Sequence, residues 1–204
     1  MTVLCSWTNG KRAVVNLVQN EAGEKYIHKI YYRGHSLWML REYANAKYLS
    51  SRLSIVPRLI SFRYWHRELV FSYIPGQRVF EWVLERFGDP GLQLDEFLNF
   101  EPMYTDERVT SAFADFRNSS SPEAINLKKA IKESYGELHR IGFQHGTCDP
   151  RNIIYDGQRV FIIDFDHARP GLNPGKYDYP ELAQWFGVTP KPQEPPLSLF
   201  GLLI

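Results

Sequence analysis

The feature that most constrains the fold is a pair of apolar segments joined by Asp156-Gly157. Residues 152–155 read Asn-Ile-Ile-Tyr, and residues 160–163 read Val-Phe-Ile-Ile. Asp-Gly between apolar segments is typical of a tight β-hairpin, because glycine adopts positive φ without a steric clash. Such a hairpin would hold Asn152 at its entrance close to Asp164 at its exit. An amide oxygen and a carboxylate oxygen that converge there suit a hard cation such as Mg²⁺.

The segments on either side of this hairpin carry a family resemblance. The loop at 145–152 reads His-Gly-Thr-Cys-Asp-Pro-Arg-Asn, and the hairpin ends in Ile-Asp-Phe-Asp at 163–166. This order resembles the protein-kinase-like superfamily, in which H-x-D-x-x-x-x-N precedes a hairpin that ends in D-F-G. It is most similar to the small atypical branch of aminoglycoside phosphotransferases, lipopolysaccharide core kinases and RIO-like kinases. The resemblance implies that Asn152 and Asp164 bind Mg²⁺ beside ATP, while Asp166 either adds to the cation site or caps the next turn.

The chain departs from the family at the position of the catalytic aspartate. Thr147 stands there, and a threonine does not accept a proton at neutral pH. The only carboxylate of the loop is Asp149, three residues before Asn152 rather than five, and Pro150 restricts Asp149 toward extended geometry. In one hypothesis Asp149 is a displaced catalytic base. In the other, the chain is a catalytically impaired pseudokinase that binds nucleotide or a protein partner.

We favour the enzyme, which would transfer the γ-phosphate of ATP to a hydroxyl group of a protein or a small molecule. A general base contributes only about 10²–10⁴-fold to a rate, so its loss weakens catalysis without abolishing it. Lys29, Glu42, Asn152 and Asp164 are all present, and a chain without ATP chemistry has no physical need for that set.

The first part of the chain supplies the remaining candidate residues. Strands are predicted at 3–5, 13–18, 25–31, 58–63 and 68–73, with a helix at 35–53. Lys29 lies among apolar neighbours on the third strand, and Glu42 is the only acidic residue of the helix. By resemblance, Lys29 binds ATP phosphates and Glu42 pairs with it; read alone, both are ordinary surface charges. Gly10 stands where the family has a glycine-rich loop, and Lys11 and Arg12 could supply positive charge there.

A strand break follows these elements at Pro75-Gly76, since proline removes a backbone donor and glycine adds freedom. In the resembled kinases, backbone groups at this junction bind adenine, which makes Tyr73 and Ile74 candidate nucleotide contacts. The predicted fold class is α+β, a minimal bilobal kinase-like fold. Its N-lobe, 1–74, has five antiparallel strands and one helix, and its short, mostly helical C-lobe covers 75–204.

Helices are predicted in the second half at 79–87, 92–100, 123–141 and 179–186. The apolar stripe of the third of these would contain Ile125, Leu127 or Lys128, Ile131, Tyr135 and Leu138. Two segments are candidate contacts for a protein partner, namely the acidic stretch 88–121 and the apolar tail that ends at residue 204. Either could instead be an ordinary elaboration of the domain.

Composition limits the remaining function classes. The 204 residues carry a formal charge of +1, which argues against a general nucleic-acid-binding protein. No apolar segment approaches the roughly 20 residues of a membrane-spanning helix. The first residues lack the layout of a signal peptide, so we expect a cytoplasmic protein, with secretion by a signal-free route left open. Two cysteines do not make a disulfide framework.

Overall fold

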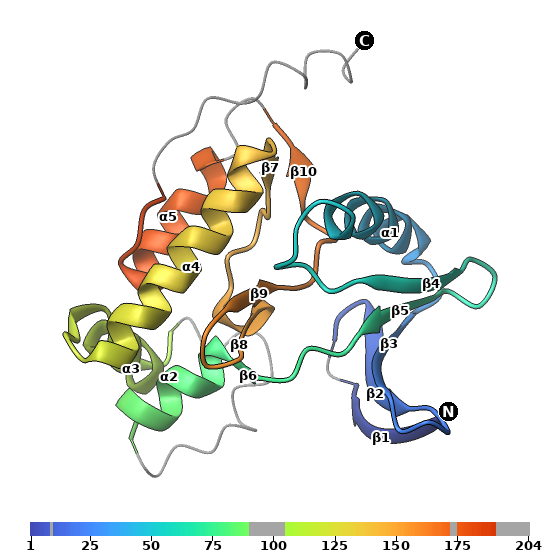
Figure 1. Ribbon diagram of the computed structural model, residues 1–204, viewed down its shortest axis with the longest axis horizontal. Helices are drawn as coiled ribbons and strands as arrows, with labels where there is room; N and C mark the ends of the chain where they lie inside the picture. Colours follow the sequence, from blue (N-terminus) through green and yellow to red (C-terminus); the bar gives the residue numbers. More distant parts are fainter. Residues whose placement is uncertain (9, 90–104, 172–174, 191–204) are drawn as a thin grey trace. The chain divides into compact units, whose positions relative to one another are not determined.

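The computed structural model describes the chain at residues 1–8, 10–89, 105–171 and 175–190 (Figure 1). The chain divides into two compact units, residues 1–75 with 163–167 and residues 76–162 with 168–204. Its fold class is α+β, as predicted, with a five-stranded antiparallel sheet and five helices in the described residues. None of these helices has the length and apolar character needed to cross a bilayer.

The first unit is built on the five-stranded sheet, whose order is β1-β2-β3-β5-β4. Its strands are β1 Thr2–Trp7, β2 Ala13–Gln19, β3 Lys25–Tyr31, β4 Leu59–Arg63 and β5 Glu68–Ser72. All five were predicted from the sequence. Each neighbouring pair is antiparallel, and β3 lies in the centre, where it pairs with β2 on one side and β5 on the other.

One helix, α1 Ser36–Ser50, supplies the other half of the core of this unit. Met39 and Ala46 of α1 are buried against Tyr31 of β3 and Leu69 of β5. Since side chains alternate along a strand, Lys29 shares the face of Tyr31. The strand therefore points a charged side chain at a helix, and this prediction from the sequence is confirmed by the position of Tyr31 in the core.

The second unit contains most of the helices and two small sheets. Its elements are β6 Gln77–Arg78, α2 Val79–Phe87, α3 Glu107–Asn118, α4 Pro122–Arg140, β7 Phe143–Gln144, η3 Pro150–Asn152, β8 Ile153–Tyr155, β9 Val160–Ile162, β10 Arg169–Pro170 and α5 Gly175–Phe186. The predicted hairpin is confirmed as the antiparallel pair β8 and β9, and β6 extends it into a three-stranded sheet. Gly157 has a φ of 97° in its turn, as the Asp-Gly pattern requires.

Helix α4 follows from clear local signals. The Ser121 side chain accepts a hydrogen bond from the Ala124 N–H, Pro122 occupies the first turn, and Gly142 with a φ of 77° ends the helix. Leu127, Ile131, Tyr135 and Leu138 are buried as predicted. Ile125 is 49% exposed, so its place in the predicted apolar stripe was wrong.

The other elements of the second half of the chain depart from the prediction or cannot be compared with it. Helix α3 was not predicted, and its Phe113 packs against Phe80 of α2 and against Trp185 and Phe186 of α5. Helix α5 begins at Gly175, four residues before the predicted start. The helix predicted at 92–100 and the apolar tail lie outside the described residues.

A substitution at Gly76 tests how tightly the start of the second unit packs. Its φ is 153°, and a Cβ at this position would lie 2.6 Å from the Tyr155 carbonyl oxygen of β8. We expect Gly76→Ala to lower the free energy of unfolding by about 3 kcal/mol, because backbone strain and a backbone clash add. Gly157→Ala is the control, since its Cβ would meet no atom within 4 Å and adds only strain of roughly 1 kcal/mol. Equal losses in urea unfolding would contradict this account of Gly76.

Candidate functional site

The centre of the candidate site is Lys29, whose ammonium group bonds two carboxylates in the first unit. Its Nζ lies 2.8 Å from Glu42 Oε2 and 2.6 Å from Asp164 Oδ1. Strand β3 positions the lysine, α1 positions Glu42, and Asp164 arrives from a segment 135 residues further along the chain. The structure therefore brings together three of the residues that the sequence singled out.

Burial makes this cluster electrostatically strong. The side chains of Lys29 and Glu42 are 13% and 4% exposed. Burial by itself would lower the pKa of Lys29, but the carboxylates of Asp164 and Glu42 outweigh it and hold this pKa well above its ordinary value. Burial raises the pKa of Glu42, and Lys29 offsets only part of that rise. The Tyr31 hydroxyl donates a further hydrogen bond to Glu42 Oε2.

Asp164 is less covered than its partners. Its side chain is 39% exposed, so the carboxylate remains accessible beside the buried lysine. Its backbone has a φ of 65°, a left-handed conformation that is uncommon outside glycine. Strain of this kind persists only where the surroundings hold the residue in place, and it occurs preferentially at functional sites.

The short segment 163–167 is held in the first unit by contacts of the two residues that follow Asp164. The Asn45 side chain of α1 donates a hydrogen bond of 2.9 Å to the Phe165 carbonyl oxygen. Phe165 itself is buried. Arg12 forms an ion pair with Asp166 Oδ2. Together with the Lys29 contact, these bonds fix the backbone that carries Asp164.

Arg12 is the candidate residue whose role the sequence defined least. It comes from the turn between β1 and β2, where the sequence suggested Lys11 and Arg12 as a source of positive charge. Its guanidinium stacks 3.8 Å from the Trp38 ring centre, and its Nη1 lies 3.0 Å from His167 Nε2. Arg12 thus neutralises Asp166 and connects the β1–β2 turn to the 163–167 segment.

The other candidate nucleotide contacts of the first unit have ordinary surroundings. Gly10 passes so close to the Ala13 carbonyl oxygen that a Cβ would clash with it, so the turn requires a glycine there. Tyr73 and Ile74 are half-buried after β5, and the Lys25 ammonium lies 5.7 Å from the Tyr73 ring centre. Their role in binding adenine stays a prediction.

The donor set for a cation is small. Within residues 1–8, 10–89, 105–171 and 175–190, no three His, Cys, Asp or Glu side chains gather as a metal-binding group. Mg²⁺ is commonly bound by one or two protein carboxylates together with phosphate oxygens and water, so it does not need such a group. Asp164 is accessible, and the buried Asp166 Oδ1 has no hydrogen-bond partner among the described residues. These carboxylates fit a phosphate-bound Mg²⁺.

In the second unit, the loop after β7 is organised by Asp178, a residue that sequence reasoning missed. The carboxylate of this fully buried residue of α5 accepts hydrogen bonds from the backbone N–H groups of His145, 2.8 Å, and Gly146, 2.9 Å. His139 Nε2 lies 2.8 Å from the same carboxylate. The Glu181 side chain accepts a bond from the Cys148 N–H in the same loop. One helix therefore fixes the loop through carboxylate-to-backbone bonds.

Asp149, the predicted displaced base, is engaged within its own loop. Its side chain caps η3 by accepting from the Arg151 N–H at 2.9 Å, and it forms an ion pair with the Arg151 guanidinium. Both residues are buried. These bonds are those of a structural cap, and Arg151 engages both oxygens of the carboxylate. The observation counts against Asp149 as a general base.

Asn152 ends η3 in the second unit, immediately before β8. Asp164 belongs to the first unit. Their expected convergence on one cation stays a prediction. Thr147 and His145 lie in the loop held by Asp178, and a His145 ring nitrogen contacts the Thr147 carbonyl oxygen.

Comparison with known protein families finds no matching family model, and comparison with curated proteins finds no match.

The role of Asp178 predicts a defined pH dependence of stability. Burial would raise the pKa of Asp178, but the bonds from His139, His145 and Gly146 outweigh it and lower this pKa. A lowered pKa in the folded state means that the stabilisation is complete above the unfolded-state pKa of about 3.9 and is lost as the pH falls through the folded value. We expect Asp178→Asn to lower the free energy of unfolding by roughly 3 kcal/mol near neutral pH, because an amide cannot accept all three hydrogen bonds.

Urea unfolding measured from about pH 7 down to pH 2 tests this prediction. The difference in the free energy of unfolding between Asp178→Asn and the parent should shrink below about pH 4. Asp115→Asn on α3 is the control, since that side chain is exposed and its loss should stay within about 0.5 kcal/mol. A loss for Asp178→Asn that is independent of pH would contradict the ionised form of Asp178.

Proposed function

We propose that this protein binds Mg-ATP and transfers the γ-phosphate to a hydroxyl group of a protein or a small molecule. The observation that supports this most is the double ion pair of Lys29 with Glu42 and Asp164. It joins a strand lysine, a helix glutamate and the aspartate of an Ile-Asp-Phe-Asp segment, in the roles that the kinase-like resemblance gives them. The sheet order β1-β2-β3-β5-β4 with one helix is compatible with a kinase-like N-lobe.

Phosphoryl transfer requires little from a protein beyond positioned reactants and compensating charge. Phosphoryl transfer is accelerated mainly by aligning the reactants and by stabilising charge on the transferred group. Lys29, with its raised pKa, stays cationic throughout the physiological range and would bind phosphate oxygens. Glu42 would orient it. Asp164, with Asn152 as second protein ligand and Asp166 nearby in sequence, would hold the Mg²⁺ that neutralises the phosphates.

In this proposal the acceptor hydroxyl loses its proton without help from a general base. Thr147 stands at the usual position of the base, and Asp149 caps η3. The expected consequence is slow turnover, reduced by the roughly 10²–10⁴-fold that a general base contributes. Arg12, bound to Asp166, supplies charge next to the cation ligands rather than to the acceptor.

The capping of Asp149 also favours a second candidate, a catalytically impaired pseudokinase. Such a protein would bind nucleotide through Lys29 and Asp164 and act through contacts with a protein partner. It shares the nucleotide site with the first candidate and differs only in turnover. The acidic stretch 88–121 is the sequence segment considered for partner contacts.

Transfer of labelled γ-phosphate from Mg-ATP to the protein itself, to water or to proteins of an extract separates the two candidates. For the enzyme we expect slow transfer that Asp164→Asn lowers by at least about 100-fold, because it removes a cation ligand. Asp149→Asn keeps an N-cap acceptor and should change the rate by less than about tenfold.

A larger loss for Asp149→Asn with unchanged stability would instead identify Asp149 as the base. If no variant transfers phosphate although Mg-ATP raises the melting temperature of the parent, the pseudokinase is correct. If Mg-ATP neither reacts nor stabilises the parent, both candidates fail.

A further inference from the structure

The turn between β4 and β5 exposes two aromatic side chains that no part of the proposed nucleotide site uses. Trp65 is 87% exposed and Tyr64 is 44% exposed. Their ring centres lie 5.2 Å apart in an edge-to-face arrangement. In Figure 1 this turn lies at the outer end of the β4–β5 hairpin.

This turn is rigidly built rather than loose. Arg67 has a φ of 57°, and its N–H donates a hydrogen bond of 3.0 Å to the Tyr64 carbonyl oxygen. The Arg67 carbonyl oxygen accepts a bond of 2.9 Å from the N–H of Tyr31, a core residue, and its Nε donates at 3.1 Å to the Tyr31 carbonyl oxygen. Positive φ outside glycine is unfavourable, so three bonds hold a strained turn that keeps Trp65 in solvent.

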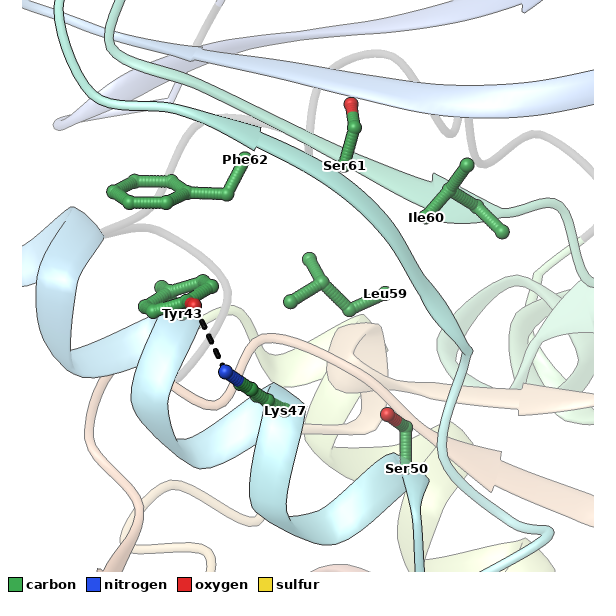
Figure 2. A pocket seen from close by; sticks show the side chains of 7 residues that line it. All are labelled: Tyr43, Lys47, Ser50, Leu59, Ile60, Ser61 and Phe62. Atoms are coloured by element: carbon green, nitrogen blue, oxygen red, sulfur yellow. Dashed lines mark hydrogen bonds between the residues drawn. The ribbon is translucent and has the colours of Figure 1, made fainter.

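A row of aromatic contacts connects the turn to helix α1. Tyr43 of α1 stacks on Phe62 of β4 with ring centres 4.1 Å apart, and Figure 2 shows the two rings facing each other. The ring centre of Phe62 also lies 6.4 Å from that of Tyr64. The row Tyr43, Phe62, Tyr64 and Trp65 thus runs from the helix–sheet contact to the tip.

The first unit, to which this turn belongs, carries an excess of positive charge. The first unit contains 11 Lys and Arg residues and six Asp and Glu residues. From Lys25 to Arg67 there are nine Lys and Arg residues, and the one acidic residue in that range, Glu42, is buried against Lys29. The chain as a whole is almost neutral, so its positive charge is concentrated in this unit. Asymmetry of this kind indicates an anionic partner.

The acidic groups nearest this turn offset only part of its positive charge. Glu68, next to the turn, lies 3.6 Å from His28 and 3.8 Å from Arg63, and its side chain is largely covered. The turn between β2 and β3 carries exposed acids at 21 and 24, and the pairing of β3 with β5 puts that turn at the opposite end of β3. Arg63, by contrast, is well exposed at the tip.

We propose that this turn docks on the surface of an anionic lipid bilayer. Trp65 and Tyr64 enter the headgroup region, where amphipathic rings are favoured. Arg63 and His66 of the turn are exposed, as is Arg33 just after the neighbouring end of β3, and these residues contact lipid phosphates. A turn at the end of a hairpin that exposes most of a tryptophan suits a soft interface. An acidic peptide or a single-stranded nucleic acid would need flanking walls or a second stacking surface around Trp65. The proposal is independent of ATP chemistry.

The test is co-sedimentation of the full chain with vesicles of phosphatidylcholine, with and without about 30% phosphatidylglycerol, at roughly 0.1 M salt. We expect binding only to the anionic vesicles. Trp65→Ser should weaken it about tenfold, and Arg63→Gln about fivefold for one lost surface charge. Tyr177→Ser on α5 and Lys129→Gln on α4 remove an exposed aromatic residue and an exposed charge of the second unit, and should leave binding unchanged.

A spectroscopic readout identifies insertion itself. Vesicles with brominated acyl chains should quench part of the tryptophan fluorescence of the parent, and Trp65→Phe should bind but lose that quenching. Binding that is unaffected by Trp65→Ser, or absent from anionic vesicles, would overturn the proposal. So would tighter binding to polyglutamate or polyuridylate that depends on the same arginines but not on Trp65.

Discussion

The interaction on which the first unit depends is the salt bridge of Lys29 with two carboxylates from distant parts of the chain. A lysine on the central strand faces an apolar core, and only the partners Glu42 and Asp164 make that burial tolerable. Removing one partner of such a buried pair typically costs about 3–5 kcal/mol, whereas apolar replacements of a whole pair are often neutral. Stability alone therefore does not explain why this cluster is charged. The binding of phosphate and a cation that we propose would explain it.

The same cluster determines the conformation of the segment 163–167. Asp164 keeps a left-handed backbone because Lys29 holds its side chain, Asn45 holds the next carbonyl group and Arg12 holds Asp166. In the second unit, Asp178 fixes the start of the loop at 145–152 in a different way, as a buried carboxylate that accepts backbone N–H groups. Both candidate functional segments are thus preorganised by charge, within units that each have their own apolar core.

The parts of this structure that the sequence predicted are those with local signals. The strands, α1, α4 and the Asp-Gly hairpin follow from alternation, helical periodicity and capping residues within a few positions. Lys29 and Glu42 were found because a family pattern connected them. Asp178 lies 33 residues from the loop that it binds, and Arg12 lies 154 residues from Asp166, so no local pattern could connect either pair. Helix α3 was missed because its buried residues are spread through an acidic stretch.

The most direct test of the central claim is the affinity for ATP measured by calorimetry with and without Mg²⁺. If Lys29 and Asp164 form a phosphate and cation site, Mg²⁺ should tighten ATP binding to the parent by at least about tenfold, or 1.4 kcal/mol. Asp164→Asn should bind ATP with little dependence on Mg²⁺, because Lys29 remains and the cation ligand is lost. Absence of ATP binding to the parent, or the same effect of Mg²⁺ in both proteins, would contradict the account.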